Sequence, residues 1–228
     1  MLSALATRVG ARRVLELGCG TGRALPWALA AGAHGFGLDL SFGMLCEAAE
    51  AGLEFVQAEA GRPPFAPASF DLVFCHNAFH HFPDKPGVAA EAFGLLRPGG
   101  AFATIGCDPR EMTWFVYDYF DGALALDMSP ERDLSIAGLE AILREAGFAQ
   151  VASPVGYRVQ ATDLGAAVLK NTFLPKDSNS TLTLLSDEAY AAGLARITAA
   201  IAAGERTGQP ARFETDFPMR MVHGFKPG

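Results

Sequence analysis

The sequence predicts an α/β fold in which a mostly parallel sheet carries helices on both faces. Through the first part of the chain, short apolar runs alternate with segments of helical spacing, and strands that alternate with helices in this way pair in parallel. The first apolar run, residues 14–17, is followed at once by Gly18, Gly20 and Gly22. A strand, a glycine turn and a helix form the first unit of sheets that bind nucleotides, so this loop is the first candidate ligand site.

Composition narrows the class of protein. Half of the 228 residues are hydrophobic, which is enough for one sizeable core, and the formal net charge is −7. An acidic chain without a basic cluster is poorly suited to grip a phosphate backbone, so we expect no nucleic-acid partner. We expect no signal peptide, because the N-terminus lacks a long apolar stretch and meets Arg8, Arg12 and Arg13 early. We expect no membrane span, because no apolar run reaches about 18 residues. The four scattered cysteines fit neither a zinc site nor a disulfide framework, which favours a cytoplasmic protein with free thiols.

The glycine loop departs from the dinucleotide fingerprint. That pattern requires Gly or Ala at its sixth position, where this chain has Arg23. Glu16, two residues before the first glycine, would repel a pyrophosphate and would attract an ammonium group or hydroxyls. The N-terminus of the helix expected from Ala24 would favour electron-rich groups. A tight turn in an α/β protein without a ligand is the alternative interpretation.

The elements of the first part follow from apolar periodicity and turn residues. Asp39 ends the second strand about 20 residues after the first glycine, where a Rossmann-like unit places the carboxylate that accepts hydrogen bonds from ribose hydroxyls. A simple turn residue is the alternative for Asp39. Ser41 can cap the helix that follows. The predicted helices span residues 2–9, 24–32, 41–52 and 86–96, and the predicted strands after the first span residues 35–40, 53–57, 69–75 and 101–106.

After residue 107 the alternation breaks. Residues 108–133 are rich in aromatic side chains, which more often pack than bind. An insertion after the fifth strand nevertheless opens at the carboxyl edge of the sheet, where ligands bind, so we predict part of a cap over the substrate. The remaining predicted elements are a helix capped by Ser135, a sixth strand at 148–155, a helix at 161–169, a surface loop at 171–180, a helix capped by Ser186, and a seventh strand at 212–225 interrupted near Pro218.

We therefore predict a single domain over residues 1–228. Its predicted core comprises residues 1–107, 134–157 and 213–228, and its predicted cap segments are residues 108–133 and 158–212.

Several of these runs together resemble one known family. The run LELGCGTG at residues 15–22 resembles motif I of the class I S-adenosylmethionine-dependent methyltransferases. The nearest likeness is the ubiquinone-biosynthesis-like, "type 11" group that acts on small molecules. It implies a Rossmann-like fold with a seven-stranded sheet whose last strand is antiparallel. The other matching runs, in the family's order between residues 12 and 107, are GLDLS at 37–41, EA at 59–60, PF at 64–65 with SFDLV at 69–73, and LLRPGG at 95–100.

The resemblance implies a role for each matched residue toward S-adenosylmethionine, whose product is S-adenosylhomocysteine. Glu59 stands where the family usually has aspartate and is one methylene longer. The chain also starts close to motif I, so the N-terminal cap helix of many relatives is expected to be absent or very short. The implied contacts are Gly18, Cys19, Gly20 and Gly22 along the methionine portion, Glu16 at its amino group, Asp39 at the ribose, Leu40, Met44, Glu59 and Ala60 around the adenine, and His76 and Asn77 near the sulfonium.

The segment HNAFHHF at residues 76–82 carries three histidines. No acidic or cysteine ligands stand at a recognisable spacing, so we expect no metal. The resemblance implies a histidine pair beside the methyl-transfer site, and a histidine near neutral pKa can accept a substrate proton. His81 is the candidate, with a role in the pocket wall as the equal alternative. We assign no catalytic residue and group His81 with Trp114 and Tyr117 as candidate substrate contacts.

The sequence thus predicts a methyltransferase that acts on a small-molecule acceptor as a monomer or homodimer. Two alternatives stay open. The first is a protein that binds S-adenosylmethionine without transfer, as a sensor or as the partner subunit of an enzyme. The second is a nicotinamide-dependent oxidoreductase, against which Arg23 and the Glu59-Ala60 pair both count.

Overall fold

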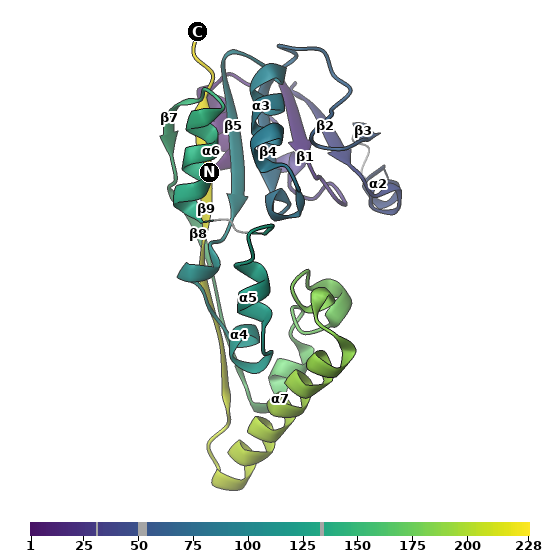
Figure 1. Cartoon of the computed structure of the whole chain (residues 1–228), viewed down its shortest axis with the longest axis vertical. Helices are drawn as coiled ribbons and strands as arrows, with labels where there is room; N and C mark the ends of the chain where they lie inside the picture. The colour runs from purple at the N-terminus through teal and green to yellow at the C-terminus, as the bar shows by residue number, and fades with distance from the viewer. Residues whose placement is uncertain (31, 50–53, 133–134) are drawn as a thin grey trace. The chain divides into compact units, whose positions relative to one another are not determined.

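The structure of the chain is a computed structural model that describes residues 1–30, 32–49, 54–132 and 135–228 (Figure 1). It divides into two compact units. Unit 1 comprises Met1–Gly106, Leu134–Gly156 and Met219–Gly228, and unit 2 comprises Cys107–Asp133 and Tyr157–Pro218. That the two units act as one domain stays a prediction.

The sheet of unit 1 has the predicted architecture. Its order is β3-β2-β1-β4-β5-β9, with β7 also paired to β9. The first five of these strands pair in parallel, and β9 is antiparallel to β5 and to β7. The α/β fold class with an antiparallel last strand is therefore confirmed. The strands are β1 (Arg13–Leu17), β2 (His34–Asp39), β3 (Glu54–Gln57), β4 (Phe70–His76), β5 (Leu96–Gly106), β7 (Ala149–Ala152) and β9 (Arg212–Phe225).

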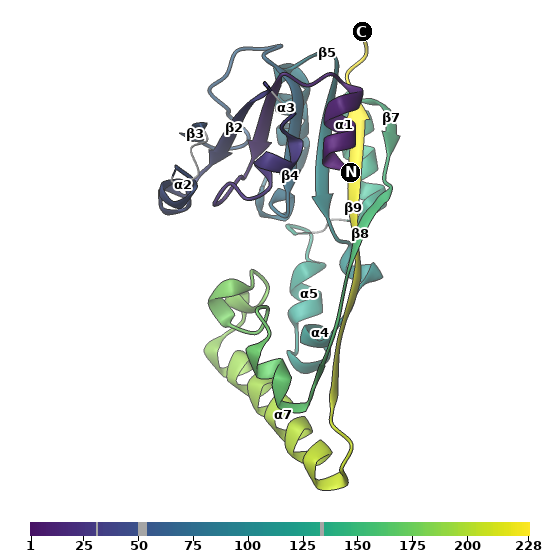
Figure 2. The same cartoon turned by 180° about the vertical axis from the view of Figure 1, so that it is seen from behind.

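Helices cover both faces of this sheet. In unit 1, α3 (Lys85–Leu95) and α6 (Ile136–Glu145) lie over the face turned to the viewer in Figure 1, and α1 (Leu2–Arg8) lies over the other face in Figure 2. The helix α2 (Phe42–Ala49) follows β2 at the other end of the sheet. Ser135 caps α6 as predicted, since its hydroxyl accepts from the N–H of Gly138 at 3.1 Å. The central strands are buried between the helices, as their continuous apolar runs indicate.

The helix predicted after the glycine loop is wrong. Among the described residues between the loop and β2, which begins at His34, the one helical element is the short 3₁₀ helix η1 (Leu25–Ala28). Pro26 is tolerated in a first turn, but Leu29 is already extended, with ψ of +118°, so the chain leaves the helical conformation after Ala28. The expectation that a helix N-terminus behind the loop would favour electron-rich groups is therefore wrong as well. The predicted helix and strand ends at residues 31 and 50–53 lie outside the described residues.

Unit 2 contains parts of the two long strands β8 (Val155–Leu164) and β9. Its helix α7 (Asp187–Thr207) is capped by Ser186 as predicted, because the hydroxyl accepts from the N–H of Ala189 at 3.1 Å. The other elements here are β6 (Thr113–Trp114), α4 (Phe115–Tyr119), α5 (Ala123–Asp127), and the 3₁₀ helices η3 (Pro109–Glu111), η4 (Gly165–Lys170), η5 (Lys176–Ser178) and η6 (Leu182–Leu184).

Two predictions in this part are wrong. The helix expected at 161–169 is instead the end of β8 followed by η4, and the two meet at Gly165, whose φ of +52° ends the strand. The seventh strand is not interrupted at Pro218. Pro218 lies between the β9 residues that pair with β6 and those that pair with β5, so its missing N–H breaks neither ladder. Across the described ranges, no helix is both long and apolar enough to cross a membrane.

Candidate functional site

The glycine loop follows β1 directly. Gly18, Gly20 and Gly22 adopt φ of +66°, +53° and +76°, a backbone region that residues with a Cβ rarely enter. A Cβ on Gly18 would also lie 2.6 Å from the Cβ of Ala78. The N–H of Gly18 donates to the carbonyl of Leu38 at 2.7 Å, which ties the start of the loop to β2. The first position of the loop therefore excludes every larger residue.

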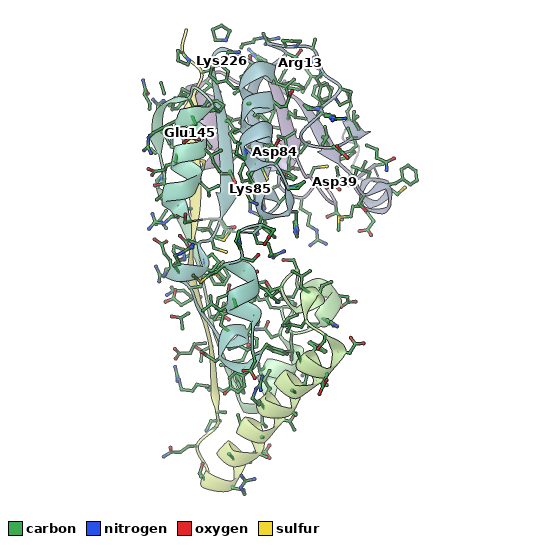
Figure 3. All side chains as sticks on the ribbon, in the orientation of Figure 1. Arg13, Asp39, Asp84, Lys85, Glu145 and Lys226 are labelled. Atoms are coloured by element: carbon green, nitrogen blue, oxygen red, sulfur yellow. The ribbon has the colours of Figure 1, made fainter. Side chains whose placement is uncertain are left out.

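Asp39 fixes the middle of the same loop. One carboxylate oxygen accepts from the N–H of Gly20 at 2.7 Å, and the other accepts from the N–H of Ser41 at 2.8 Å. Figure 3 shows Asp39 near α2, at the end of β2. A carboxylate has about four lone-pair sites, so these two bonds leave it able to accept from a ligand. The sequence predicted this position for Asp39, but its bond to the loop emerges only from the structure.

Glu16 is a buried acid without a full set of partners. Its side chain is 2% exposed, and its Oε2 has no hydrogen-bond partner among the described residues. Burial raises the pKa of Glu16 to about 8, the N–H of Leu25 acts against this, and the charge of Asp39 adds to it. Burial also raises the pKa of the neighbouring Cys19 to about 12, so that thiol is no nucleophile at neutral pH. A cation beside Glu16 would supply its missing partner.

Exposed apolar side chains border the loop. Leu40 and Phe42 are each 66% exposed and Met44 is 49% exposed. The Met44 sulfur would lie 3.6 Å from a Cβ at Gly20, which places this side chain against the loop. Neighbouring exposed apolar groups indicate a binding surface, and here they suit a flat ring. Phe42 was missed in the sequence, although its place directly after Ser41 was a usable signal.

Glu59 and Ala60 come after β3 at the same edge. Gln57, the last residue of β3, pairs in parallel register with Asp39. The side chain of Glu59 is exposed, while Ala60 is buried. The carbonyl of Glu59 accepts from the N–H of Arg62 at 3.0 Å, which shapes the turn that carries both residues.

His76 and Asn77 end β4. Asn77 has a φ of +51°, unusual for a residue with a side chain, and its N–H donates to the carbonyl of Ile105 at 2.9 Å. Such strained positions often lie at functional sites. The ring of His76 meets that of Trp27 edge-on at 5.2 Å. Burial lowers the pKa of His76, which keeps this imidazole neutral at physiological pH.

The three candidate substrate contacts lie in different units. His81 is exposed in the 3₁₀ helix η2 (Phe79–His81) of unit 1, with its ring 3.9 Å from that of His80. Trp114 and Tyr117 belong to unit 2, and their rings meet edge-on at 5.1 Å. The hydroxyl of Tyr117 donates to Asp127 at 2.8 Å, and burial followed by the Asp127 charge raises the pKa of that phenol.

The structure thus brings eleven of the twelve candidate cofactor contacts to one edge of unit 1. They follow β1, β2, β3 and β4, or end them, and parallel strands present their carboxyl ends at the same edge. Glu16 is the exception in placement, since it lies inside β1. Within the described part of the chain, no cluster of three or more His, Cys, Asp or Glu side chains could hold a metal ion.

A family model described as a methyltransferase domain matches residues 15–104. The chain carries a class I methyltransferase domain. The match spans the glycine loop, Asp39 and the segment after β4, so the edge described above belongs to the methyltransferase domain. The predicted membership of this family is confirmed.

Two curated relatives resemble the methyltransferase domain. The phthiotriol/phenolphthiotriol dimycocerosates methyltransferase of Mycobacterium leprae is 32% identical over 169 residues, which cover 64% of this chain and 62% of that protein. The ubiquinone biosynthesis O-methyltransferase of Aromatoleum aromaticum is 38% identical over 103 residues, 41% of this chain and 44% of that protein. The chain therefore spans less than two thirds of the length of these curated relatives.

A solved structure resembles nearly the whole chain. It is a protein of Anabaena variabilis described as a methyltransferase from an antibiotic biosynthesis pathway. The TM-score is 0.76 at 20% identity, over 98% of this chain and 95% of that one. At this identity the likeness is one of fold.

Proposed function

We propose that the protein transfers the methyl group of S-adenosylmethionine to a small-molecule acceptor. The observation that carries the proposal is the pair of acids at the loop. Glu16 presents a buried oxygen without a partner, which suits an ammonium group. Asp39 keeps free acceptor sites at the end of β2, which suits a pair of hydroxyls. An amino acid joined to a ribose has both groups.

The other residues at this edge would complete the cofactor site. Leu40 and Met44 offer exposed apolar surface to the adenine, and Glu59 and the N–H of Ala60 would bond its edge. The loop of Gly18, Cys19, Gly20 and Gly22 would lie along the methionine portion. His76 and Asn77 would close the end near the sulfonium.

The chemistry asks little of the protein beyond positioning. S-adenosylmethionine supplies an electrophilic methyl group on its sulfonium. The protein must hold the acceptor atom in line with that methyl group and exclude water. This explains why no nucleophilic side chain is needed, and the raised pKa of Cys19 is consistent with it.

A hydroxyl acceptor must also lose a proton, and a neutral imidazole can take it. His76 is held neutral by burial, and His81 is the candidate from the sequence. Comparing His76→Gln with His81→Gln separates the two. The variant of the base lowers kcat and flattens its pH profile, while the variant of a wall residue changes KM.

Calorimetric titration of the full chain with S-adenosylhomocysteine, S-adenosylmethionine and NADH tests the proposal. We expect both adenosyl ligands to bind and NADH not to bind. Binding of NADH alone would restore the oxidoreductase alternative. If S-adenosylmethionine binds but a panel of phenols, carboxylic acids and amines yields no S-adenosylhomocysteine, a cofactor-binding protein without transfer replaces the enzyme. The monomer or homodimer state and the cytoplasmic location stay predictions.

A further inference from the structure

One face of β9 in unit 2 is apolar except for a single hydroxyl. Phe213, Thr215 and Phe217 alternate along the strand and are all buried, with Thr215 only 2% exposed. The opposite face carries Asp216, which accepts hydrogen bonds from Arg158 and Gln160. Since alternate residues of a strand share a face, Thr215 is a polar residue placed among phenylalanines.

Trp114 lies directly across from this hydroxyl. The register of β6 and β9 pairs Trp114 with Thr215, and side chains directly opposite one another in antiparallel strands share a face. Trp114 is 8% exposed. Its Nε1 and the Oγ1 of Thr215 are both buried, and neither has a hydrogen-bond partner among the described residues. Buried polar groups are almost always paired, so two orphans on one small face call for an explanation.

The neighbouring polar groups are satisfied within unit 2. Asp127 accepts from Tyr117 at 2.8 Å, from Thr181 at 2.8 Å and from Arg132 at 3.1 Å, and the Arg132 bond also neutralises its charge. Among the described residues, none of these groups forms a hydrogen bond with Trp114 Nε1 or Thr215 Oγ1. The region therefore offers one N–H donor and one hydroxyl, without an unpaired charge from Asp127.

Aromatic rings surround the orphan pair. Trp114 meets Tyr117 at 5.1 Å, Phe173 at 5.9 Å and Phe217 at 6.3 Å, all edge-on. Of these rings Phe173 is the most exposed, at 36%. Because both orphan atoms are buried, a ligand can reach them only if a ring moves, and Phe173 is the ring nearest to solvent.

We propose that this face, made of Trp114, Tyr117, Phe173, Thr215 and Phe217 and here named the aromatic face, is a ligand-binding site of unit 2 in its own right. Indole N–H is a donor only, so the ligand atom that meets it must be an acceptor. The surrounding rings favour a flat apolar body. Because the charge of Asp127 is already neutralised by Arg132, the site does not favour a cationic ligand. The ligand is therefore a neutral aromatic compound with a carbonyl oxygen, bound by Trp114 through that oxygen.

The chain has two tryptophans, which allows a direct test. The full chain is labelled with ¹⁵N-tryptophan, and Trp27→Phe assigns the two indole N–H signals. Acetophenone and 2-acetylnaphthalene are titrated against ethylbenzene and 2-ethylnaphthalene, which match them in shape and lack the oxygen. We expect the ketones to shift the Trp114 N–H proton downfield and the hydrocarbons to leave it in place.

Variants then measure the contribution of each orphan atom. Trp114→Phe keeps a ring and removes the donor, and Thr215→Val keeps the shape and removes the hydroxyl. Each is expected to weaken ketone binding about tenfold. Thr113→Val is the matched control, because Thr113 is exposed and pairs with Asp216 rather than with Thr215. Should Trp114→Phe fail to fold, the signal of the unmodified chain still decides.

The two proposals fail separately. If S-adenosylhomocysteine binds but no ketone moves the Trp114 signal, or hydrocarbons move it equally, the aromatic face is not a ligand site. If the ketones shift Trp114 while no adenosyl ligand binds, the aromatic face binds its ligand and the methyltransferase function is wrong. Unchanged ketone affinity in both Trp114→Phe and Thr215→Val also overturns the role of the orphan atoms.

Discussion

Replacing Glu16 by glutamine is expected to remove a pH-dependent destabilisation of the ligand-free protein and to weaken its binding of S-adenosylmethionine. The side chain is 2% exposed, and burial raises its pKa from 4.5 to about 8. Glutamine has the same shape and stays neutral at every pH. The substitution should therefore raise the stability of the ligand-free protein and lower its affinity for S-adenosylmethionine. Few substitutions at a merely structural position would change these two quantities in opposite directions.

The sign of the stability effect follows from proton binding. Between pH 4.5 and pH 8 the folded protein keeps the Glu16 proton, whereas the unfolded chain releases it. The unfolded state then binds fewer protons, so stability falls as pH rises through this window. At 1.36 kcal/mol per pKa unit, the full window corresponds to about 5 kcal/mol, and the part lost by pH 7 is about 3 kcal/mol. Both are upper estimates, because water entry on relaxation reduces them.

Urea unfolding of both proteins at pH 5, 7 and 8 measures this effect. The difference in unfolding free energy, Glu16→Gln minus unmodified, is expected to grow by about 2–4 kcal/mol between pH 5 and pH 8. Glu47→Gln is the control, because Glu47 is an exposed glutamate on α2, and its difference should stay flat. Calorimetry at pH 7 should show binding of S-adenosylmethionine weakened at least about tenfold, the usual loss of a charge-assisted bond. Equal affinity of the two proteins, or a flat stability difference, would refute the role of Glu16.

Three further substitutions give sharp outcomes, and Gly10→Ala and Asp71→Asn serve as controls for the first two. Gly18→Ala should abolish measurable binding of S-adenosylhomocysteine, because the φ of +66° disfavours a Cβ and the new Cβ would lie 2.6 Å from the Cβ of Ala78. Gly10→Ala should bind normally, because Gly10 has a similar φ of +59° but a Cβ there would meet nothing within 4 Å. Asp39→Asn should raise the calorimetric Kd about tenfold or more. Asp71→Asn should lower Tm and leave that Kd unchanged, since Asp71 holds the N–H groups of residues 12 and 13. Tyr117→Phe should lower the urea unfolding free energy by about 1–2 kcal/mol through its lost bond to a buried carboxylate.

The sheet could be predicted because its signals are local. The central strands β1, β2 and β4 contain short apolar runs, and the parallel pairing of the strands follows from their alternation with helices. The failure at η1 also has a local cause. The run from Ala24 suggested a helix, but the chain is extended again at Leu29, so it ends after one short 3₁₀ helix.

The contacts that define the two sites depend on register and could not be predicted. The bond from Gly20 to Asp39 needs the pairing of β1 with β2. Part of the aromatic face could be predicted, because Phe213, Thr215 and Phe217 stand at alternate positions of the sequence and so share one face of a strand. The pairing of Trp114 with Thr215 could not be predicted, because the two residues are far apart along the chain.

The loss of the expected helix bears on which cofactor the loop can hold. A dinucleotide site binds its pyrophosphate with backbone N–H groups of the loop and of the helix behind it. Here Gly18 and Cys19 donate to the carbonyl of Leu38, Gly20 donates to Asp39, and Gly22 donates to the carbonyl of Cys19. Four loop amides are thus used inside the protein, and η1 supplies no α-helix N-terminus. The loop is left with carbonyl oxygens and two acids, a set of acceptors that opposes a pyrophosphate and favours the ammonium and hydroxyl groups of an adenosyl amino acid.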